Sequence, residues 1–185
     1  FVRIYRADIG ISVNSQLCLT VTIPGQANIS GAQRTQSIMD LVVSLPLITG
    51  ARCAIASNFY PRGVQPYRVT VPGNDVGAAD FAVDGVSVST DFFSILGCRL
   101  IRGTLFEGIY PTDLRSVVLT ERSAKLLFPN ADPIGQSISI SGKSPWKVIG
   151  VIQDIGGRTQ VSRPTLYYPY WQGMTPPAFS LLVER

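Results

Sequence analysis

The 185-residue sequence contains no histidine. Histidine is the usual general base near neutral pH and a common metal ligand, so its absence excludes Ser-His and Cys-His dyads and histidine metal sites. Twelve acidic residues remain, and we interpret Asp80 and Asp84 as solvated residues at a strand edge. We predict no catalytic residue and no enzymatic activity. A carboxylate-based hydrolase stays open as an alternative, and it would need two acids converging in a cleft.

Cysteine is scarce, with Cys18, Cys53 and Cys98 only, and their spacing fits no metal site. Each lies in an apolar or strand-like stretch, where a thiol is usually a small buried side chain. A disulfide between Cys18 and Cys53 is one alternative, because both are expected on neighbouring strands. We expect no metal and no cofactor.

No apolar run is long enough to cross a bilayer, since the longest, residues 41–56, is interrupted by Pro46, Gly50 and Arg52. Only 15% of the residues are charged, and the basic ones are scattered singly, which argues against nucleic-acid binding. The 45% of hydrophobic residues can build a sizeable core. The sequence starts at Phe1 with no charged leader or apolar signal core, so we expect a segment of a longer protein.

The first 60 residues predict a strand, helix, strand unit. Residues 16–23 alternate between apolar and polar side chains, and Ser30 with Gln33 has the spacing of a capping box for a helix over 31–45 that ends at Pro46. We interpret the first ten residues as the frayed end of a helix. Further strands are predicted over residues 52–60, 67–71, 81–88, 116–119, 137–140, 146–152, 165–170 and 179–183, and a helix capped by Thr120 runs through Leu127.

The segment 87–103 organises the rest of the chain. Ser89 or Thr90 can cap a short helix, and Gly97 suits its left-handed exit. The apolar side chains between them exceed what so short a helix can leave in water, so the helix must dock on a sheet. These side chains are Phe92, Phe93, Ile95 and Leu96.

Two other stretches suggest binding functions. SGKS at 141–144 is similar to the end of a phosphate-binding loop, but Pro145 and Trp146 stand where its helix must begin, so we predict a hairpin turn. The candidate interface residues are Tyr167, Tyr168, Tyr170 and Trp171. They suit a stacking platform or interface, although strand alternation favours packing in the core or between subdomains. Exposure of Trp171 discriminates between these readings.

Several motifs occur in a fixed order along the chain. They are RADIGI from Arg6, LTVTIPG from Leu19, VSTDFFSILGCRLIRGTLF from Val88, VVLTERSAKLLFPNADPIGQSI from Val117, WKVIGVIQDI from Trp146 and PTLYYPY from Pro164. In this order they resemble the MacB-type periplasmic core domain of ABC transporter permeases, within the FtsX-like and MacB-like superfamily and its duplicated-permease branch.

The resemblance implies an α+β fold with two subdomains. A porter-like βαβ layer would comprise residues 1–80 and a return segment, 156–185, and a strand-rich sabre-like subdomain would be inserted at 81–155. The porter-like layer is expected to be partly incomplete, with an exposed sheet edge able to pair with a neighbouring molecule.

The resemblance also implies a function without enzymatic chemistry. Such a domain would lie in the periplasm as part of a bacterial inner-membrane protein, dimerise through a second permease copy, and couple ATP-driven motion of membrane helices to substrate or a periplasmic adaptor. ATP would be bound by a cytoplasmic ATPase domain or subunit. The family motifs are structural and carry over no binding residue. The alternative is a stand-alone periplasmic module that binds a ligand or protein through the strip from Tyr167 to Trp171.

Overall fold

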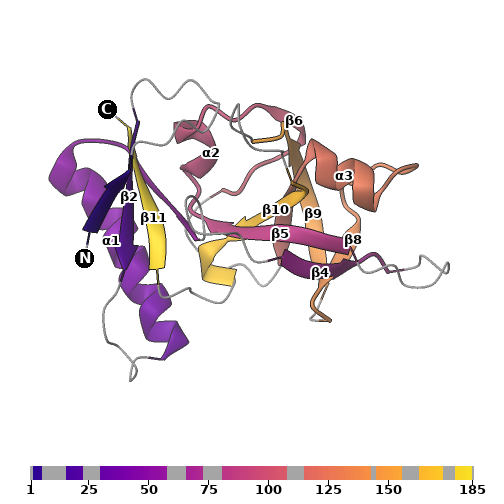
Figure 1. Ribbon diagram of the computed structural model, residues 1–185, viewed down its shortest axis with the longest axis horizontal. Coiled ribbons are helices and arrows are strands. Elements are labelled where there is room, and N and C mark those ends of the chain that lie inside the picture. The colour runs from indigo at the N-terminus through magenta and orange to yellow at the C-terminus, as the bar shows by residue number, and fades with distance from the viewer. Residues whose placement is uncertain are drawn as a thin grey trace.

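The computed structural model describes residues 2–5, 16–22, 30–57, 66–72, 81–107, 115–142, 145–155, 163–172 and 178–184. These ranges form an α+β fold (Figure 1). Its strands are β1 (Val2–Tyr5), β2 (Gln16–Thr22), β3 (Cys53–Ser57), β4 (Pro66–Thr70), β5 (Phe81–Val88), β6 (Leu100–Gly103), β7 (Ser116–Thr120), β8 (Ser137–Ile140), β9 (Trp146–Ile152), β10 (Thr165–Pro169) and β11 (Ala178–Glu184). Its helices are α1 (Gly31–Thr49), α2 (Phe92–Ile95), α3 (Glu121–Leu127) and the 3-10 turn η1 (Tyr170–Gln172).

Six strands close into a ring, which we call the barrel. The pairing runs β5, β10, β7, β9, β8 and β4, and β4 pairs with β5 again. Closing a sheet on itself satisfies the backbone of every member strand and leaves no open edge between them. Strand β6 pairs with residues 150–152 of β9, beyond the part of β9 that pairs with β8.

The remaining strands form an open sheet in the order β1, β2, β11, β3. Strand β11, last in the chain, is antiparallel to both β2 and β3, so β2 and β3 are parallel to each other with β11 between them. The predicted strand, helix, strand unit is therefore present as a split βαβ unit, in which α1 makes the connection.

The position of β11 excludes the alternative of a disulfide between Cys18 and Cys53. Cys18 pairs with Leu182 of β11, and Cys53 pairs with Val183 on the other side of the same strand. Two strand spacings are roughly 9.5 Å, which is beyond the Cα separation that a disulfide bridges. The Cys53 thiol is buried and donates to the Ala51 carbonyl at 3.5 Å.

The start of the chain also differs from the prediction. Residues 2–5 form β1, which pairs antiparallel with β2, and the prediction of a helix is wrong for them. Val2 and Ile4 alternate with Arg3 at the two-residue period of a strand, and β2 has an edge that β11 does not occupy. In the described residues β1 is the outer strand of the open sheet. Its pairing with a neighbouring molecule stays a prediction.

Helix α1 begins as predicted and ends later. The Ser30 hydroxyl accepts the Gln33 N–H at 3.2 Å, and the Gln33 side chain accepts the Ser30 N–H at 3.0 Å, which completes the capping box. The helix continues through Pro46 and ends at Gly50, whose φ is 67°. Pro46 lacks one donor, but its carbonyl still accepts the Gly50 N–H at 2.9 Å, so one more turn forms.

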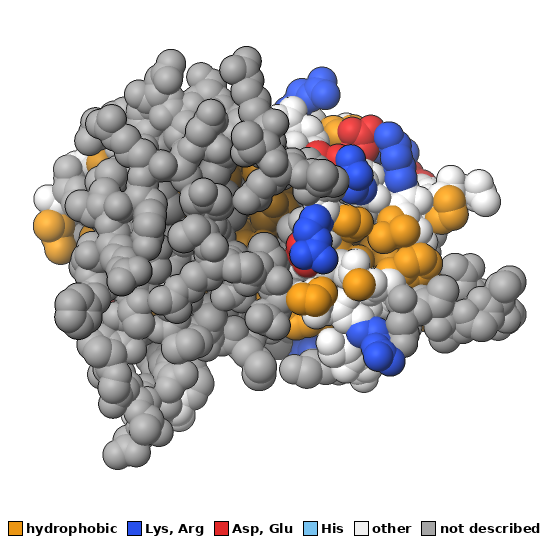
Figure 2. Space-filling view, viewed as in Figure 1, with side chains coloured by type: hydrophobic (Ala, Val, Ile, Leu, Met, Phe, Trp, Pro, Cys, Tyr) orange, Lys and Arg blue, Asp and Glu red, His pale blue; other side chains and the backbone are white. Residues whose placement is uncertain are grey.

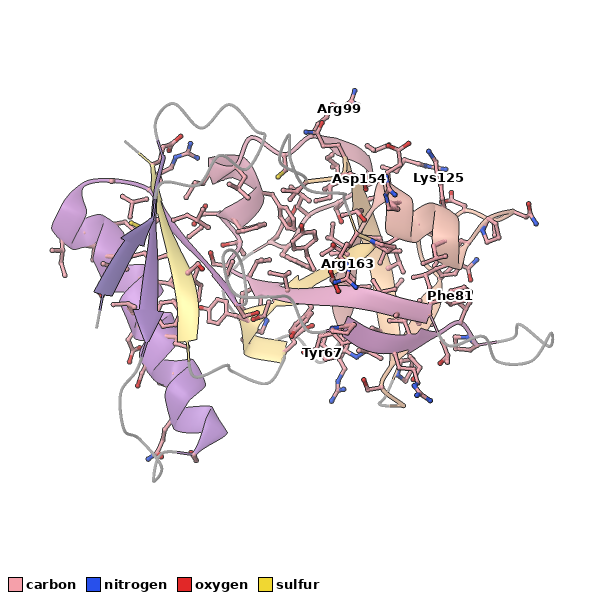
Figure 3. The ribbon with its side chains drawn as sticks, viewed as in Figure 1. Tyr67, Phe81, Arg99, Lys125, Asp154 and Arg163 are labelled. Carbon is pink, nitrogen blue, oxygen red and sulfur yellow. The ribbon has the colours of Figure 1, made fainter. Side chains whose placement is uncertain are left out.

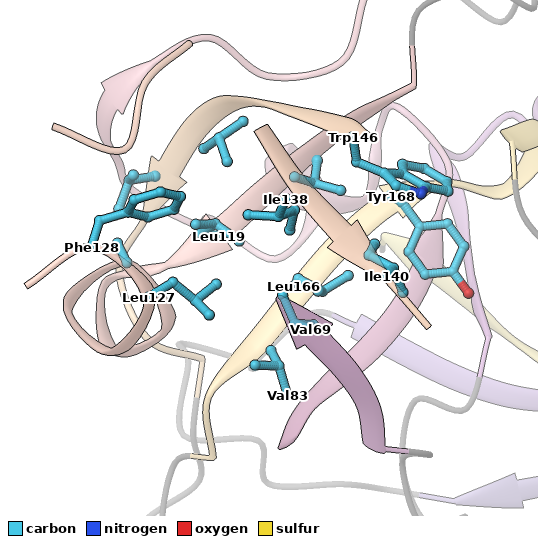
Figure 4. Close-up of a cluster of buried hydrophobic side chains, with 14 residues drawn as sticks. Val69, Val83, Leu119, Leu127, Phe128, Ile138, Ile140, Trp146, Leu166 and Tyr168 are labelled. Atoms are coloured by element: carbon cyan, nitrogen blue, oxygen red, sulfur yellow. The ribbon is translucent and has the colours of Figure 1, made fainter. Parts of the chain in front are cut away.

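Side chains from all six strands fill the barrel (Figure 4). Helix α3 closes it through Leu127 and Phe128, and the Thr120 hydroxyl accepts the Ser123 N–H as the predicted cap. The hairpin of β8 and β9 is confirmed, with positive φ at Ser141 and Gly142 in its turn. The strand-borne core residues are Val69, Val83, Val117, Leu119, Ile138, Ile140, Trp146, Val148, Val151, Leu166 and Tyr168.

Candidate functional site: the junction of barrel and open sheet

Strand β5 belongs to both parts of the molecule. Its first half pairs with β4, its second half pairs with β10, and Val88 at its end pairs with Ala56 of β3. This is one register pair, so the backbone ladder between the barrel and the open sheet is short. Val83 faces the barrel core, while Val86 and Val88 face the opposite side. Strand β5 is continuous through Gly85. Its buried apolar side chains lie on one face before Gly85 and on the other face after it, with no shift in the strand pairing.

Three buried serines strengthen this short ladder. The Ser89 hydroxyl accepts the Ile55 N–H at 3.0 Å, and the Ser89 N–H donates to the Ile55 carbonyl at 3.0 Å. The Ser57 hydroxyl accepts the Ser87 N–H at 2.8 Å. Ser57, Ser87 and Ser89 are all buried. A buried N–H without a partner is costly, so these hydroxyls replace ladder bonds that the diverging strands no longer make.

Helix α2 covers the junction, as the sequence predicted. Phe92, Phe93, Ile95 and Leu96 are fully or almost fully buried. The Phe93 ring lies 5.4 Å from the Phe92 ring and 5.4 Å from the Tyr167 ring, both edge to face. The cluster around them includes Leu182 of the open sheet. Apolar packing therefore joins the two parts where the ladder is shortest.

The cap of α2 differs from the prediction. The N-cap residue is Asp91, and its side chain makes no capping hydrogen bond. The hydroxyl of Ser89 is occupied by Ile55 of β3. Gly97 takes the expected left-handed conformation, with φ at 62°. Ser89, which was predicted as a possible helix cap, therefore forms a hydrogen bond to β3 at the junction.

The four candidate interface residues distribute among three apolar clusters. Tyr168 points into the barrel, Tyr167 packs in the junction cluster, and Tyr170 packs beneath α1. All three are buried, and Trp171 is partly buried beside Tyr170. This arrangement matches the core-packing reading of the strip. An interface role stays a prediction, and Trp171 is its best candidate.

Burial also keeps these phenols neutral. It raises the pKa of Tyr167 and Tyr168 far above the ordinary range and that of Tyr170 to about 12. The Tyr168 hydroxyl lies 3.1 Å from that of Tyr67, whose position Figure 3 shows. Burial likewise raises the pKa of the Cys98 thiol to about 12. None of these groups is poised to exchange protons near neutral pH.

The interpretation of Asp80 and Asp84 as solvated residues at a strand edge is wrong for Asp84, and Asp80 lies outside the described residues. Asp84 lies within β5, between β4 and β10, and 4% of its surface is exposed. Burial raises the pKa of its carboxyl group, and Arg163, with its Nε 3.5 Å from Oδ2, opposes the rise. Figure 3 shows Arg163 over β5. No sequence pattern around Asp84 indicates this burial, because β10, one of the strands that flank β5, lies far from it in the chain.

The described ranges contain no candidate metal site and no candidate membrane-spanning helix. There, no group of three or more cysteine, aspartate or glutamate side chains is arranged to hold a metal ion. No helix in these ranges is both long and apolar enough to cross a membrane.

Comparison with known proteins identifies the family. A family model, the MacB-like periplasmic core domain, matches residues 11–183. The macrolide export ATP-binding/permease protein MacB of Aggregatibacter actinomycetemcomitans is 35% identical over 86 residues, or 45% of this chain and 13% of that protein. Its namesake from Salmonella typhimurium is 32% identical over 79 residues, or 42% of this chain and 12% of that protein. The matched segment is thus a small part of these curated relatives.

Solved structures share the fold. The periplasmic region of MacB from Actinobacillus actinomycetemcomitans superposes with a TM-score of 0.58 at 18% identity, covering 95% of this chain and 76% of that one. The extracellular domain of the noncanonic ABC-type transporter YknZ from Gram-positive bacteria gives 0.56 at 15% identity, covering 89% and 81%. Together with the family match, these likenesses show that the chain belongs to the MacB-like periplasmic core domains, a family of extracytoplasmic domains of ABC transporter permeases.

Proposed function

We propose that the chain is the periplasmic domain of a bacterial ABC transporter permease and transmits ATP-driven motion of the membrane helices to a substrate or a periplasmic adaptor. The family match over residues 11–183 is the observation that carries this proposal. A second permease copy would complete a dimer, and a cytoplasmic ATPase domain or subunit would supply the energy. In this role the domain makes and breaks no covalent bonds and needs no cofactor.

The junction supports a rigid transmitting role. The hydroxyls of Ser57 and Ser89 and the rings of α2 tie the barrel to the open sheet through buried contacts. A displacement of the barrel is then transmitted to the open sheet, because close-packed protein interiors deform little under load.

In this proposal the open sheet with α1 corresponds to the porter-like layer and the barrel to the sabre-like subdomain. The segment 81–155 supplies five barrel-associated strands, β5 to β9, while β4 and β10 come from the flanking segments. The division into 1–80, 81–155 and 156–185 stays a prediction.

The alternative is a stand-alone periplasmic module that binds a ligand or protein through the strip from Tyr167 to Trp171. Burial of Tyr167, Tyr168 and Tyr170 reduces the part of this strip that a partner can reach, and this supports the transmitting role over the alternative.

The test uses the full permease reconstituted in nanodiscs, with a spin label at Lys147→Cys, an exposed position on β9 of the barrel. Double electron–electron resonance would measure the distance between the two labels of a dimer. We expect ATP to change this distance, and Ser89→Ala, which loosens the junction, to broaden the distance distribution. Ser137→Ala, at an exposed serine of β8, is the control. A dimer distance that ATP leaves unchanged in the protein labelled at Lys147→Cys, with both junction serines intact, would refute the proposed function.

A further inference from the structure

The 3-10 turn η1 forms a second contact between the barrel and the open sheet, which we call the η1 contact. The turn follows β10, and the Gln172 side chain ties it to the barrel by accepting the Ser116 N–H of β7 at 3.1 Å. On its other side, Tyr170 packs in one cluster with Ile38 and Val42 of α1. Successive residues of β3 alternate between this cluster and the junction cluster, so the two contacts lie on opposite faces of the open sheet.

Two polar atoms of η1 are buried without a hydrogen-bond partner among the described residues. They are the hydroxyl of Tyr170 and Nε1 of Trp171, and the two rings lie 5.1 Å apart, edge to face. Tyr170 as a whole is 3% exposed. A buried polar group without a partner destabilises the state that buries it, because the same group is hydrogen-bonded once water reaches it.

The junction beneath α2 differs from the η1 contact in this respect. At the junction the hydroxyls of Ser57 and Ser89 accept buried N–H groups across the strands. In α1 the hydroxyls of Ser37 and Ser44 donate to carbonyls of the helix itself, at 3.0 and 3.2 Å. Hydrogen bonds between elements therefore hold the junction, whereas apolar packing that includes two unpaired polar groups holds α1 against η1.

Helix α1 packs through a narrow face. Among its described side chains Ile38 and Val42 are buried, while Val43, Leu47 and Ile48 of its last turns are 48%, 83% and 78% exposed. Figure 2 shows hydrophobic side chains protruding at the left margin, where Figure 1 places the last turns of α1. Most of the stability of a helix in a protein comes from the packing of one face, so α1 loses protection of its amides once this face separates from η1 and the sheet.

We infer that α1 separates from η1 and the open sheet in a local opening, while the junction beneath α2 stays closed. The closed state gains the apolar burial of Ile38 and Val42, and the open state hydrates the Tyr170 hydroxyl and Trp171 Nε1. These contributions oppose each other, which makes the contact reversible. The inference goes beyond the proposed function and does not depend on it, because every contact involved belongs to this chain. It makes α1 the element of the domain that is displaced most readily.

Amide hydrogen exchange on this chain tests the inference. In the unmodified chain the amides of residues 38–45 should exchange faster than the Ser89 amide, which donates to the Ile55 carbonyl at 3.0 Å. Tyr170→Phe removes the unpaired hydroxyl and keeps the ring, so it stabilises the closed state. We expect it to slow exchange at residues 38–45 by on the order of tenfold and to leave α1 closed for longer.

The matched control is Tyr168→Phe. The Tyr168 hydroxyl lies 3.1 Å from that of Tyr67 and is therefore paired, so its removal should not slow exchange in α1. Two outcomes overturn the inference. Equal exchange at residues 38–45 and at Ser89 in the unmodified chain would show that α1 opens only when the junction opens as well. Unchanged or faster exchange in Tyr170→Phe would show that the hydroxyl already has a partner in the closed state.

Discussion

Asp84 places a carboxylate inside β5, and its titration should be visible in the stability of the protein. Its folded pKa is raised by burial, so between the ordinary value and the raised value the folded state binds more protons than the unfolded state. The free energy of unfolding therefore rises as the pH falls through this window, and it falls again as the pH rises. Above this window the carboxyl group is ionised in both states, and the folded state bears the full free-energy cost of burying the charge.

We expect Asp84→Asn to raise the midpoint of thermal unfolding at pH 8 and to flatten its dependence on pH. The amide keeps the shape of the side chain without the buried charge, and the exposed Arg163 loses little by losing its partner. Differential scanning calorimetry between pH 4 and pH 8 would measure both effects. Asp132→Asn, at an exposed carboxylate, is the control. A lower midpoint for Asp84→Asn at pH 8 would contradict the prediction.

Phe93 is completely buried against Phe92, Tyr167 and Phe106. Phe93→Ala should lower the free energy of unfolding by about 3 to 5 kcal/mol, because it removes a large apolar side chain and leaves a cavity. Urea denaturation measures this loss, with Leu126→Ala on the exposed side of α3 as the control. A loss near zero would mean that the ring does not fill the junction.

Local patterns predicted residues whose partners lie nearby in the sequence, such as Ser30 with Gln33 and Thr120 with Ser123. They missed Ser89, whose partner Ile55 lies 34 residues away. A hydroxyl before a helix has the same sequence signal whether it caps that helix or bonds a distant strand. For this reason the burial of the apolar side chains of α2 could be predicted, while the hydrogen bonds that hold the junction could not.

At the scale of elements, the backbones of β6 and β9 approach each other closely at two glycines. Gly103 and Gly150 pair directly across these strands. A Cβ atom on Gly150 would collide with the carbonyl oxygen of Thr104, which belongs to the backbone and cannot rotate away. This tight approach explains a glycine in the middle of a strand.

Gly150→Ala should therefore displace β6 and destabilise the protein by roughly 1 to 3 kcal/mol through overpacking. Chemical denaturation measures the loss, and amide hydrogen exchange should be faster at Thr104, which donates to the Ile149 carbonyl at 2.9 Å. Lys147→Ala, at an exposed position of the same strand, should change neither. Unchanged protection of Thr104 in Gly150→Ala would refute the close approach.

Elements were predicted well where periodicity was strong, as for β5, whose bounds match the prediction from Phe81 to Val88. Strand β6 escaped prediction because its four residues are all exposed and show no alternation. The extension of α1 past Pro46 was not predicted, because a proline was taken as the end of the helix. The helix ends instead at Gly50. The order of strands could not be read at all, since β11 lies between strands more than 120 residues earlier.

At the scale of the whole molecule, the junction cluster should make barrel and open sheet unfold together. Ser57→Ala combined with Ser89→Ala would leave the N–H groups of Ser87 and Ile55 without their buried partners. Each loss costs about 1 to 3 kcal/mol. We expect the single calorimetric transition to separate into two, with a van't Hoff enthalpy below the calorimetric one.

The matched control for this pair is Ser37→Ala with Ser137→Ala, both at exposed positions. It should keep one transition. If the junction variant also unfolds in one transition, apolar packing alone couples the two parts.

The position of β11 has a consequence for biosynthesis. Strand β11 is synthesised more than 120 residues after β3, yet it becomes the inner strand between β2 and β3. Until β11 emerges from the ribosome, the nascent chain exposes the edges of β2 and β3 that β11 later occupies, and exposed strand edges can pair wrongly. The sheet that begins near residue 16 can therefore be completed only after residues 178–184 have been made.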